Sequence, residues 1–164
     1  MADVIIVMGS DSDLPVMQVC VDMLKKFDIS YSVNVMSAHR TPAAVADLVS
    51  NARNTGAKVI VAGAGCAAHL AGVAAAHTTL PVIGVPLAGS NLQGMDALLA
   101  TVQMPAGVPV ATVAIGKAGA ANAGLLAAQI IGVTDKTMQG KLAEHKKEMA
   151  EKVAAKNASI QGKI

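Results

Sequence analysis

Short apolar runs alternate along the chain with longer segments whose apolar residues recur at helical spacing. The apolar runs predict strands at residues 4–8, 31–35, 59–62, 82–85 and 110–114. The segments between them predict helices at about residues 14–27, 42–54, 69–77, 95–102 and 117–131. Strands that are apolar throughout, each followed by a helix, are typical of a buried parallel sheet. The pattern therefore predicts an α/β fold of three layers, with a five-stranded parallel sheet and helices on both faces.

One more helix is predicted beyond these five units. Over residues 135–157, apolar residues recur near helical spacing with Lys and Glu between them, at Met138, Leu142, Met149 and Val153. This helix has no place in the five-unit sheet. We therefore expect residues 1–133 to form a single α/β domain, and residues 134–164 to form a C-terminal amphipathic helix and tail at a subunit interface. The alternative is a helix that folds back on its own domain.

Hydropathy alone would assign part of the chain to a membrane, because the only charged residues between Val59 and Thr134 are Asp96 and Lys117. Gly, Pro, Asn, Gln and His interrupt this stretch every few residues, so we expect no membrane association. The excess of Ala and Gly lets helices pack closely, often against other subunits. It favours a homo-oligomer with an extensive interface.

The formal net charge of +2 is unevenly distributed. Residues 1–133 contain six Lys or Arg and seven Asp or Glu, a net of −1, whereas residues 134–164 contain seven Lys and four Asp or Glu, a net of +3. The body of the chain thus lacks a cationic stripe. With one Tyr, one Phe and no Trp, it also lacks a surface on which bases can stack. We therefore expect no nucleic-acid partner.

The two cysteines, Cys20 and Cys66, are too few for a disulfide framework, and their spacing matches no metal-binding motif. We interpret both as reduced thiols of a cytoplasmic protein, and we expect no metal. The apolar run at residues 4–8 is too short for the core of a signal peptide. Cys66 is either a reactive thiol in a site loop or a small filler.

The densest chemistry lies at residues 36–42, where Ser37, His39 and Arg40 follow an expected strand. The next helix opens with Thr41 at the N-cap and Pro42 at the first helical position. A helix N-terminus and an arginine both suit a phosphate. A histidine beside that anion titrates near neutral pH. Because the chain shows no carboxylate pair, Ser-His-Asp set or metal-ligand cluster, His39 is the candidate general acid/base.

Two further loops follow the first and third expected strands. In the loop at residues 9–13, Ser10 can donate to a phosphate or sugar oxygen and Asp13 can accept from ribose hydroxyls. The alternative for this loop is a helix cap made by Ser12 or Asp13.

The loop at residues 63–69 consists of small residues that leave room for a flat ligand, followed by His69, which lines a pocket or is structural. All three loops leave the sheet at the carboxyl ends of its strands. In such sheets the ligand site lies on that edge, at a switch in strand order.

Five segments, in order and at matching spacing between about residues 4 and 131, resemble the N5-carboxyaminoimidazole ribonucleotide mutases of bacterial purine biosynthesis. They are Met8-Gly9-Ser10-Asp11-Ser12-Asp13, Ser37-Ala38-His39-Arg40-Thr41-Pro42, Ala62-Gly63-Ala64-Gly65 with Ala67-Ala68-His69-Leu70, Gln103-Met104-Pro105, and Ala114-Ile115-Gly116-Lys117-Ala118-Gly119-Ala120-Ala121-Asn122-Ala123. The resemblance implies a flavodoxin-like fold and a homo-octamer. It also implies transfer of a carboxylate from N5 to C4 of an aminoimidazole ribonucleotide, without metal, biotin, ATP or another cofactor.

The resemblance also implies roles for single residues. His39 would be the general acid/base, and Ser10, Asp13 and Arg40 would contact the ribonucleotide phosphate. Four more positions, Ser37, Gly65, His69 and Leu70, match positions of the family's substrate pocket. The chain departs from the family's usual pattern at Cys66, Ala71 and Ala106, where glycine, proline and arginine are common.

Two alternatives compete with the mutase. The first is the carbon dioxide-dependent carboxylase of the same family, which resembles this chain less over residues 63–70 and usually has Lys at the position of Arg40. The second is a flavodoxin-like nucleotide-binding or signalling module. A phospho-receiver needs an acceptor Asp after the third strand, where this chain has Ala62-Gly63-Ala64. A flavin site commonly has aromatic walls, and this chain has few aromatic residues.

Overall fold

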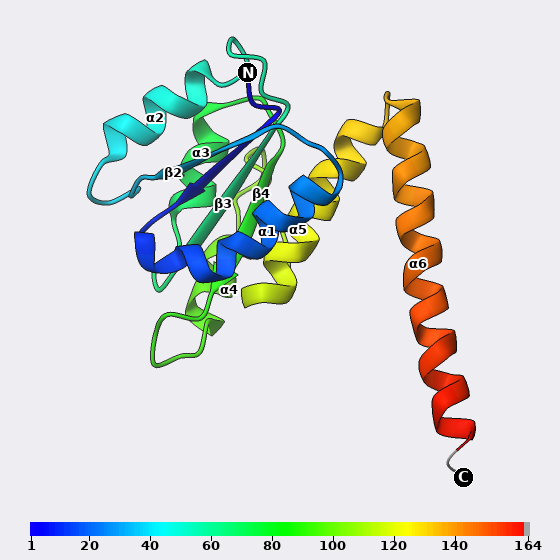
Figure 1. Ribbon diagram of the computed structural model, residues 1–164. Helices are drawn as coiled ribbons and strands as arrows, with labels where there is room; N and C mark the ends of the chain where they lie inside the picture. Colours follow the sequence, from blue (N-terminus) through cyan, green and yellow to red (C-terminus); the bar gives the residue numbers. More distant parts are fainter. Residues whose placement is uncertain (163–164) are drawn as a thin grey trace. The chain divides into compact units, whose positions relative to one another are not determined.

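The computed structural model describes residues 1–162 and contains one parallel sheet of five strands. Figure 1 shows this sheet between helices. The strands are β1 (Val4–Met8), β2 (Tyr31–Val35), β3 (Val59–Gly65), β4 (Val82–Leu87) and β5 (Ala111–Thr112). Their order across the sheet is β2-β1-β3-β4-β5. This is the flavodoxin-like order, in which the direction of chain winding switches between β1 and β3. The predicted fold class is confirmed.

Helices follow the strands in alternation. They are the short 3-10 helix η1 (Asp11–Asp13), α1 (Leu14–Lys26), α2 (Pro42–Asn51), α3 (Leu70–His77), α4 (Met95–Val102), α5 (Gly116–Gly132) and α6 (Lys136–Gln161). The predicted helices are all present. Helix α2 ends three residues earlier than expected, and α3 starts at Leu70, with His69 at its N-cap.

The central strands are apolar because both of their faces are covered. Every residue of β1 and β4 is buried, whereas the edge strand β2 is partly exposed. On one face, the core joins β1 and β3 to apolar residues of α2 and α3. On the other face Gly63 packs closely against helix α1, since a Cβ there would lie only 2.5 Å from the Met17 sulfur. Helix α5 contacts α1 on that same face, since a Cβ on Gly124 would meet Met23. Helices thus cover both faces of the sheet.

Two strands extend further than the sequence predicts. The segment Gly63-Ala64-Gly65, expected as a loop, continues β3, and Pro86 and Leu87 continue β4. Residues 64 and 65 pair with residues 86 and 87. Proline has no N–H to donate to a neighbouring strand, but β5 pairs with β4 only at Ile83 and Gly84. Pro86 therefore faces no strand on its β5 side. Strand β5 covers only Ala111–Thr112 of the predicted range 110–114.

Contacts divide the chain into a unit of residues Met1–Ala127 and a second unit that begins at Ala128. The second unit contains the end of α5 and the helix α6. Helix α6 corresponds to the helix predicted at 135–157 and ends four residues later, at Gln161. The Asp135 side chain caps α6 by accepting from the Met138 N–H at 3.0 Å. Of its apolar residues, Met138 is buried, but Met149 and Val153 are exposed. The domain boundary at residue 133 and the interface role of α6 stay predictions.

Within the described residues, we find no helix that combines the length and the apolar character needed to span a membrane.

Candidate active site

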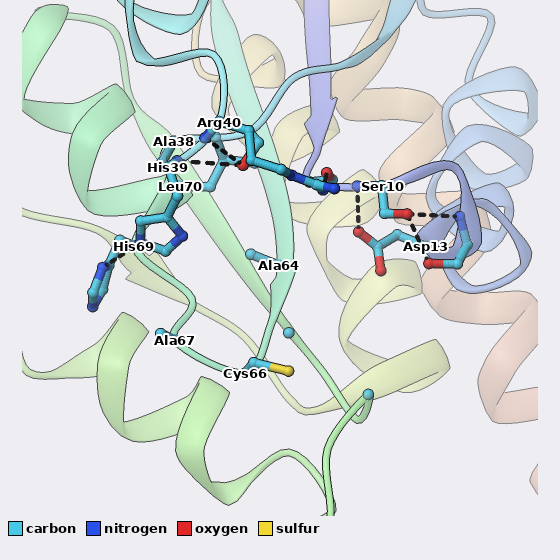
Figure 2. A pocket seen from close by; sticks show the side chains of 15 residues that line it. Ser10, Asp13, Ala38, His39, Arg40, Ala64, Cys66, Ala67, His69 and Leu70 are labelled. Carbon is cyan, nitrogen blue, oxygen red and sulfur yellow. Dashed lines mark hydrogen bonds between the residues drawn. The ribbon is translucent and has the colours of Figure 1, made fainter.

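A cavity of about 390 Å³ lies at the carboxyl edge of the sheet (Figure 2). Its wall comes from the segments after β1, β2 and β3, with Gly89 added from the segment after β4. The volume is within the range of small-molecule sites. All eight residues that the sequence predicts for the site line this one cavity: Ser10, Asp13, Ser37, His39, Arg40, Gly65, His69 and Leu70.

The turn between β2 and α2 is held by two hydroxyl groups. Ser37 Oγ accepts from the backbone N–H groups of His39 at 3.3 Å and Arg40 at 3.1 Å. Thr41 Oγ1 accepts from the Ser37 N–H at 2.9 Å and donates to the Ser37 carbonyl at 3.2 Å. Thr41 occupies the N-cap of α2 as predicted, but its side chain makes no capping hydrogen bond to the helix. The hydroxyls stabilise the turn, and the turn positions His39 and Arg40.

Arg40 links two of the site loops. Its Nη2 donates to the Gly9 carbonyl at 2.8 Å, which joins the turn after β2 to the end of β1. Arg40 also lines a neighbouring hollow of about 310 Å³. Because a guanidinium has five N–H donors, this bond leaves other donors available to an anion. Figure 2 shows the side chain reaching toward Ser10.

The loop after β1 serves as a helix cap and as a cavity wall at the same time. Ser10 Oγ accepts from the Ser12 N–H at 3.3 Å, and Asp13 Oδ2 accepts from the Ser10 N–H at 3.0 Å, which together form a capping box on η1. Burial raises the pKa of Asp13, while hydrogen bonds from the Ser10 and Gly9 backbone and the charge of Arg40 act in the opposite direction. The loop therefore forms a helix cap and also lines the cavity, and its contact with a ligand stays a prediction.

The two histidines of the site are in direct contact. His39 Nε2 and His69 Nδ1 lie 2.8 Å apart, and the rings meet edge to face with centroids 4.9 Å apart. They come from different elements, the turn before α2 and the N-cap of α3. The sequence left open whether His69 lines a pocket or is structural; it lines the cavity and contacts His39.

Small residues form the wall opposite these histidines. A Cβ on Gly65 would lie 3.2 Å from the Leu87 carbonyl oxygen, so the ends of β3 and β4 approach closely there. The next residue, Cys66, is exposed and has a φ of 54°, a left-handed conformation that favours glycine. Sequence reasoning missed Gly89. The signal for it was available, because it follows the fourth strand at the same edge of the sheet.

A metal site would need several ligating side chains close together. Among residues 1–162, no three or more His, Cys, Asp or Glu side chains gather in a way that could hold a metal ion.

Comparison with known proteins adds the family. Residues 3–152 match the protein family described as AIR carboxylase. The chain is 55% identical over 150 residues to the N5-carboxyaminoimidazole ribonucleotide mutase of Vibrio parahaemolyticus. This alignment covers 92% of this chain and 93% of that protein. It is 55% identical over 141 residues to the protein of the same name from Bacillus subtilis, which covers 86% of this chain and 87% of that one.

A solved structure is similar over nearly the whole chain. The crystal structure of Treponema denticola PurE superimposes with a TM-score of 0.84 and 27% sequence identity, over 95% of this chain and 96% of that one. The fold comparison and the sequence comparison thus agree. With the family match covering most of its length, this chain belongs to the AIR carboxylase family.

Proposed function

We propose that the protein is an isomerase of purine biosynthesis that converts N5-carboxyaminoimidazole ribonucleotide to 4-carboxy-5-aminoimidazole ribonucleotide. The observation that carries this proposal is the cavity in which His39, Arg40, Ser10 and Asp13 meet, in a chain whose relatives at 55% identity bear the mutase name. No cofactor is needed, because the reaction moves a carboxylate within one molecule and exchanges only a proton with the protein.

The reaction takes two steps at His39. In the first, the protonated imidazole gives its proton to the exocyclic nitrogen, the bond from that nitrogen to the carboxylate carbon breaks, and carbon dioxide leaves. In the second, the electron-rich ring carbon C4 attacks carbon dioxide, and the neutral imidazole removes the proton from C4. His39 begins and ends protonated, so protons balance. An imidazole can both give and take a proton, which both steps require.

Binding of the ribonucleotide phosphate holds the reacting ring beside His39. Arg40 supplies a charge-assisted donor set at the cavity wall. Ser10 and Asp13 lie near the Arg40 guanidinium at the η1 turn, where a hydroxyl can contact phosphate and a carboxylate can contact ribose. Holding the substrate in this orientation lowers the barrier, because reacting atoms then start near the geometry of attack.

Carbon dioxide must stay in the site between the two steps. The wall made by Ala64, Gly65 and Ala67 presents small groups without charge. Such a wall leaves space for a small neutral molecule and offers water little to bind. Ser37 and Leu70 complete the wall beside the histidines.

The test is turnover of N5-carboxyaminoimidazole ribonucleotide with isotopically labelled bicarbonate in the medium. Rapid formation of the C4-carboxylated product with little label is the expected result. Heavy labelling, with turnover of the uncarboxylated ribonucleotide, would identify the carboxylase instead. Absence of either conversion would support the nucleotide-binding module.

The homo-oligomer belongs to this proposal, with eight copies as the expected number. One face of α4 supports it, since Met95, Leu99 and Val102 recur at helical spacing and are 52%, 51% and 48% exposed. An exposed apolar stripe of this kind is typical of an interface. Light scattering should give a mass about eight times that of the chain; the mass of a single chain would refute the assembly. A cytoplasmic location fits an enzyme of purine biosynthesis with two free cysteines.

A further inference from the structure

The contact between His39 and His69 restricts where their protons can be. With Nε2 of one ring 2.8 Å from Nδ1 of the other, the space between the nitrogens holds a single hydrogen. A neutral imidazole has one N–H donor and one acceptor nitrogen, so the direction of this bond decides which nitrogen of His39 is left for the substrate. In Figure 2 the His39 ring lies between His69 and the interior of the cavity.

Two directions are conceivable, and they differ in chemistry. If His69 Nδ1–H donates, neutral His39 carries its own proton on Nδ1. Giving that proton to the substrate would then leave an imidazolate. If His39 Nε2–H donates, the bond persists whether His39 is neutral or protonated. Nδ1 is then the nitrogen that gives the proton in the first step and takes it in the second.

We propose that His69 is a positioning residue for the acid/base reaction, acting through its Nδ1 as the permanent acceptor for His39 Nε2–H. This inference rests on the proposed function for its consequence, but the hydrogen bond itself does not. His69 holds the His39 ring in one orientation and one tautomer, so that the same nitrogen, Nδ1, faces the substrate in both steps. For Nδ1 to accept this bond, the ring proton of His69 must lie on Nε2.

The backbone around His69 suits this task. His69 is the N-cap of α3, yet its side chain makes no capping bond to that helix. The backbone is held instead, because the His69 N–H donates to the Ala67 carbonyl at 2.8 Å and the His69 carbonyl accepts from Val73 at 2.9 Å. A fixed backbone with a ring not needed by its own helix can place an acceptor nitrogen accurately.

The first test compares two substitutions of His69. Leucine has similar bulk and no acceptor, whereas the Oδ1 of asparagine lies as many bonds from Cα as Nδ1 does. We expect His69→Leu to lower kcat about 10- to 100-fold with KM nearly unchanged, less than the about 10²–10⁴ attributed to a whole general acid–base step. We expect His69→Asn to restore most of kcat. Because His69 is exposed, both variants should fold, which circular dichroism checks.

The matched control is His77→Leu, at the other end of α3 and outside the cavity, which should leave kcat unchanged. Equal losses in His69→Leu and His69→Asn, or a change in KM alone, would overturn the positioning role. The latter result would make His69 a substrate contact.

The second test observes the tautomer directly and needs no substrate. With ¹⁵N-labelled histidine, nitrogen–proton correlation spectra distinguish protonated from bare ring nitrogens. Neutral His39 should carry its proton on Nε2 in the wild type, and should become a mixture of tautomers in His69→Leu. A proton on His39 Nδ1 in the wild type would overturn the proposal. If the wild type shows no mutase activity, the proposed function is refuted, but the tautomer seen in this spectrum still stands.

Discussion

The two edges of the sheet each carry a polar hollow, and the larger of the two is not the candidate active site. The hollow at the amino edge measures about 480 Å³, against about 390 Å³ for the cavity at the carboxyl edge. It is lined by Ser50, Arg53, Asn54, Ala76, His77, Thr78 and Thr79, so it also has an arginine, a histidine and hydroxyls. Size and residue types alone therefore do not identify the site.

The difference lies in what the polar groups bind. At the amino edge, Arg53 Nη2 donates to the Thr79 carbonyl at 3.3 Å and to its hydroxyl at 3.1 Å, and Ser50 donates to the His77 carbonyl at 3.2 Å. These bonds connect the chain near the ends of α2 and α3, where the helix dipoles favour cations and disfavour anions. At the carboxyl edge, the helices begin instead of ending. The same residue types therefore close the structure at one edge and face a ligand cavity at the other.

Exchanging His39 for asparagine should separate the two edges most clearly. His39→Asn removes the acid/base and should lower kcat about 10²–10⁴-fold while fold and ligand binding persist. His77→Asn, at the amino edge, should change kcat less than about twofold. Steady-state kinetics with circular dichroism measures both. Near-normal turnover in His39→Asn would remove His39 from the mechanism.

The two arginines make the second comparison. Arg40→Ala should weaken binding of phosphate-bearing ligands about 10- to 100-fold, because a hydrogen bond to a charged group contributes about 1.5–3 kcal/mol. Arg53→Ala, which affects only the amino edge, should leave that affinity unchanged. Calorimetric titration with the aminoimidazole ribonucleotide gives both values. Equal affinities in the wild type and Arg40→Ala would refute the phosphate role of Arg40.

The two cysteines differ in the same way between interior and site. Cys20 is fully buried, and burial raises its pKa to about 12, whereas Cys66 is exposed at the cavity wall. Iodoacetamide should therefore alkylate Cys66 in the folded protein and spare Cys20, since the thiolate is the reactive form. The added group should slow turnover by narrowing the cavity. Cys66→Ala should keep turnover and resist the reagent; inactivation of that variant would place the effect elsewhere.

The smallest effect is expected from an ion pair near the amino end of β1. Lys58 Nζ lies 2.8 Å from Asp3 Oδ1, with the side chains 55% and 32% exposed. Burial alone would raise the pKa of Asp3, but hydrogen bonds from Lys58 and Ser30 outweigh it, so the pKa is lowered. A carboxyl with a lowered pKa stabilises the fold above its unfolded pKa, and this contribution disappears as the pH falls through its folded pKa.

Lys58→Ala should thus cost at most about 1 kcal/mol at pH 7. The difference from the wild type should shrink as the pH falls into the range where Asp3 titrates. Urea unfolding at several pH values measures it. Kinetic constants should not change, because this pair lies outside the cavity; a changed KM would show that the two edges are coupled.

Much of the site could be predicted from the order of elements. Because carboxyl ends of parallel strands share one edge, Ser10, His39 and Gly65, which stand at or after the ends of three strands, had to lie on the same side of the sheet. Gly89 was missed, since Ala88 and Gly89 carry no reactive group. The predicted end of β3, at residue 62, was wrong. Gly63-Ala64-Gly65 has little strand propensity of its own, and pairing with β4 makes it part of the strand.

The alternation of strands and helices and the residue types at each strand end could be derived from the chain's local pattern. The packing of separate elements brings His39 and His69, thirty positions apart, into a hydrogen bond, and it brings the Arg40 guanidinium to the Gly9 carbonyl. Packing also sets the hydrogen bonds by which the polar side chains of the amino-edge hollow bind to its own wall. These contacts depend on how separate elements pack in space, and the order of residues along the chain does not give their distances.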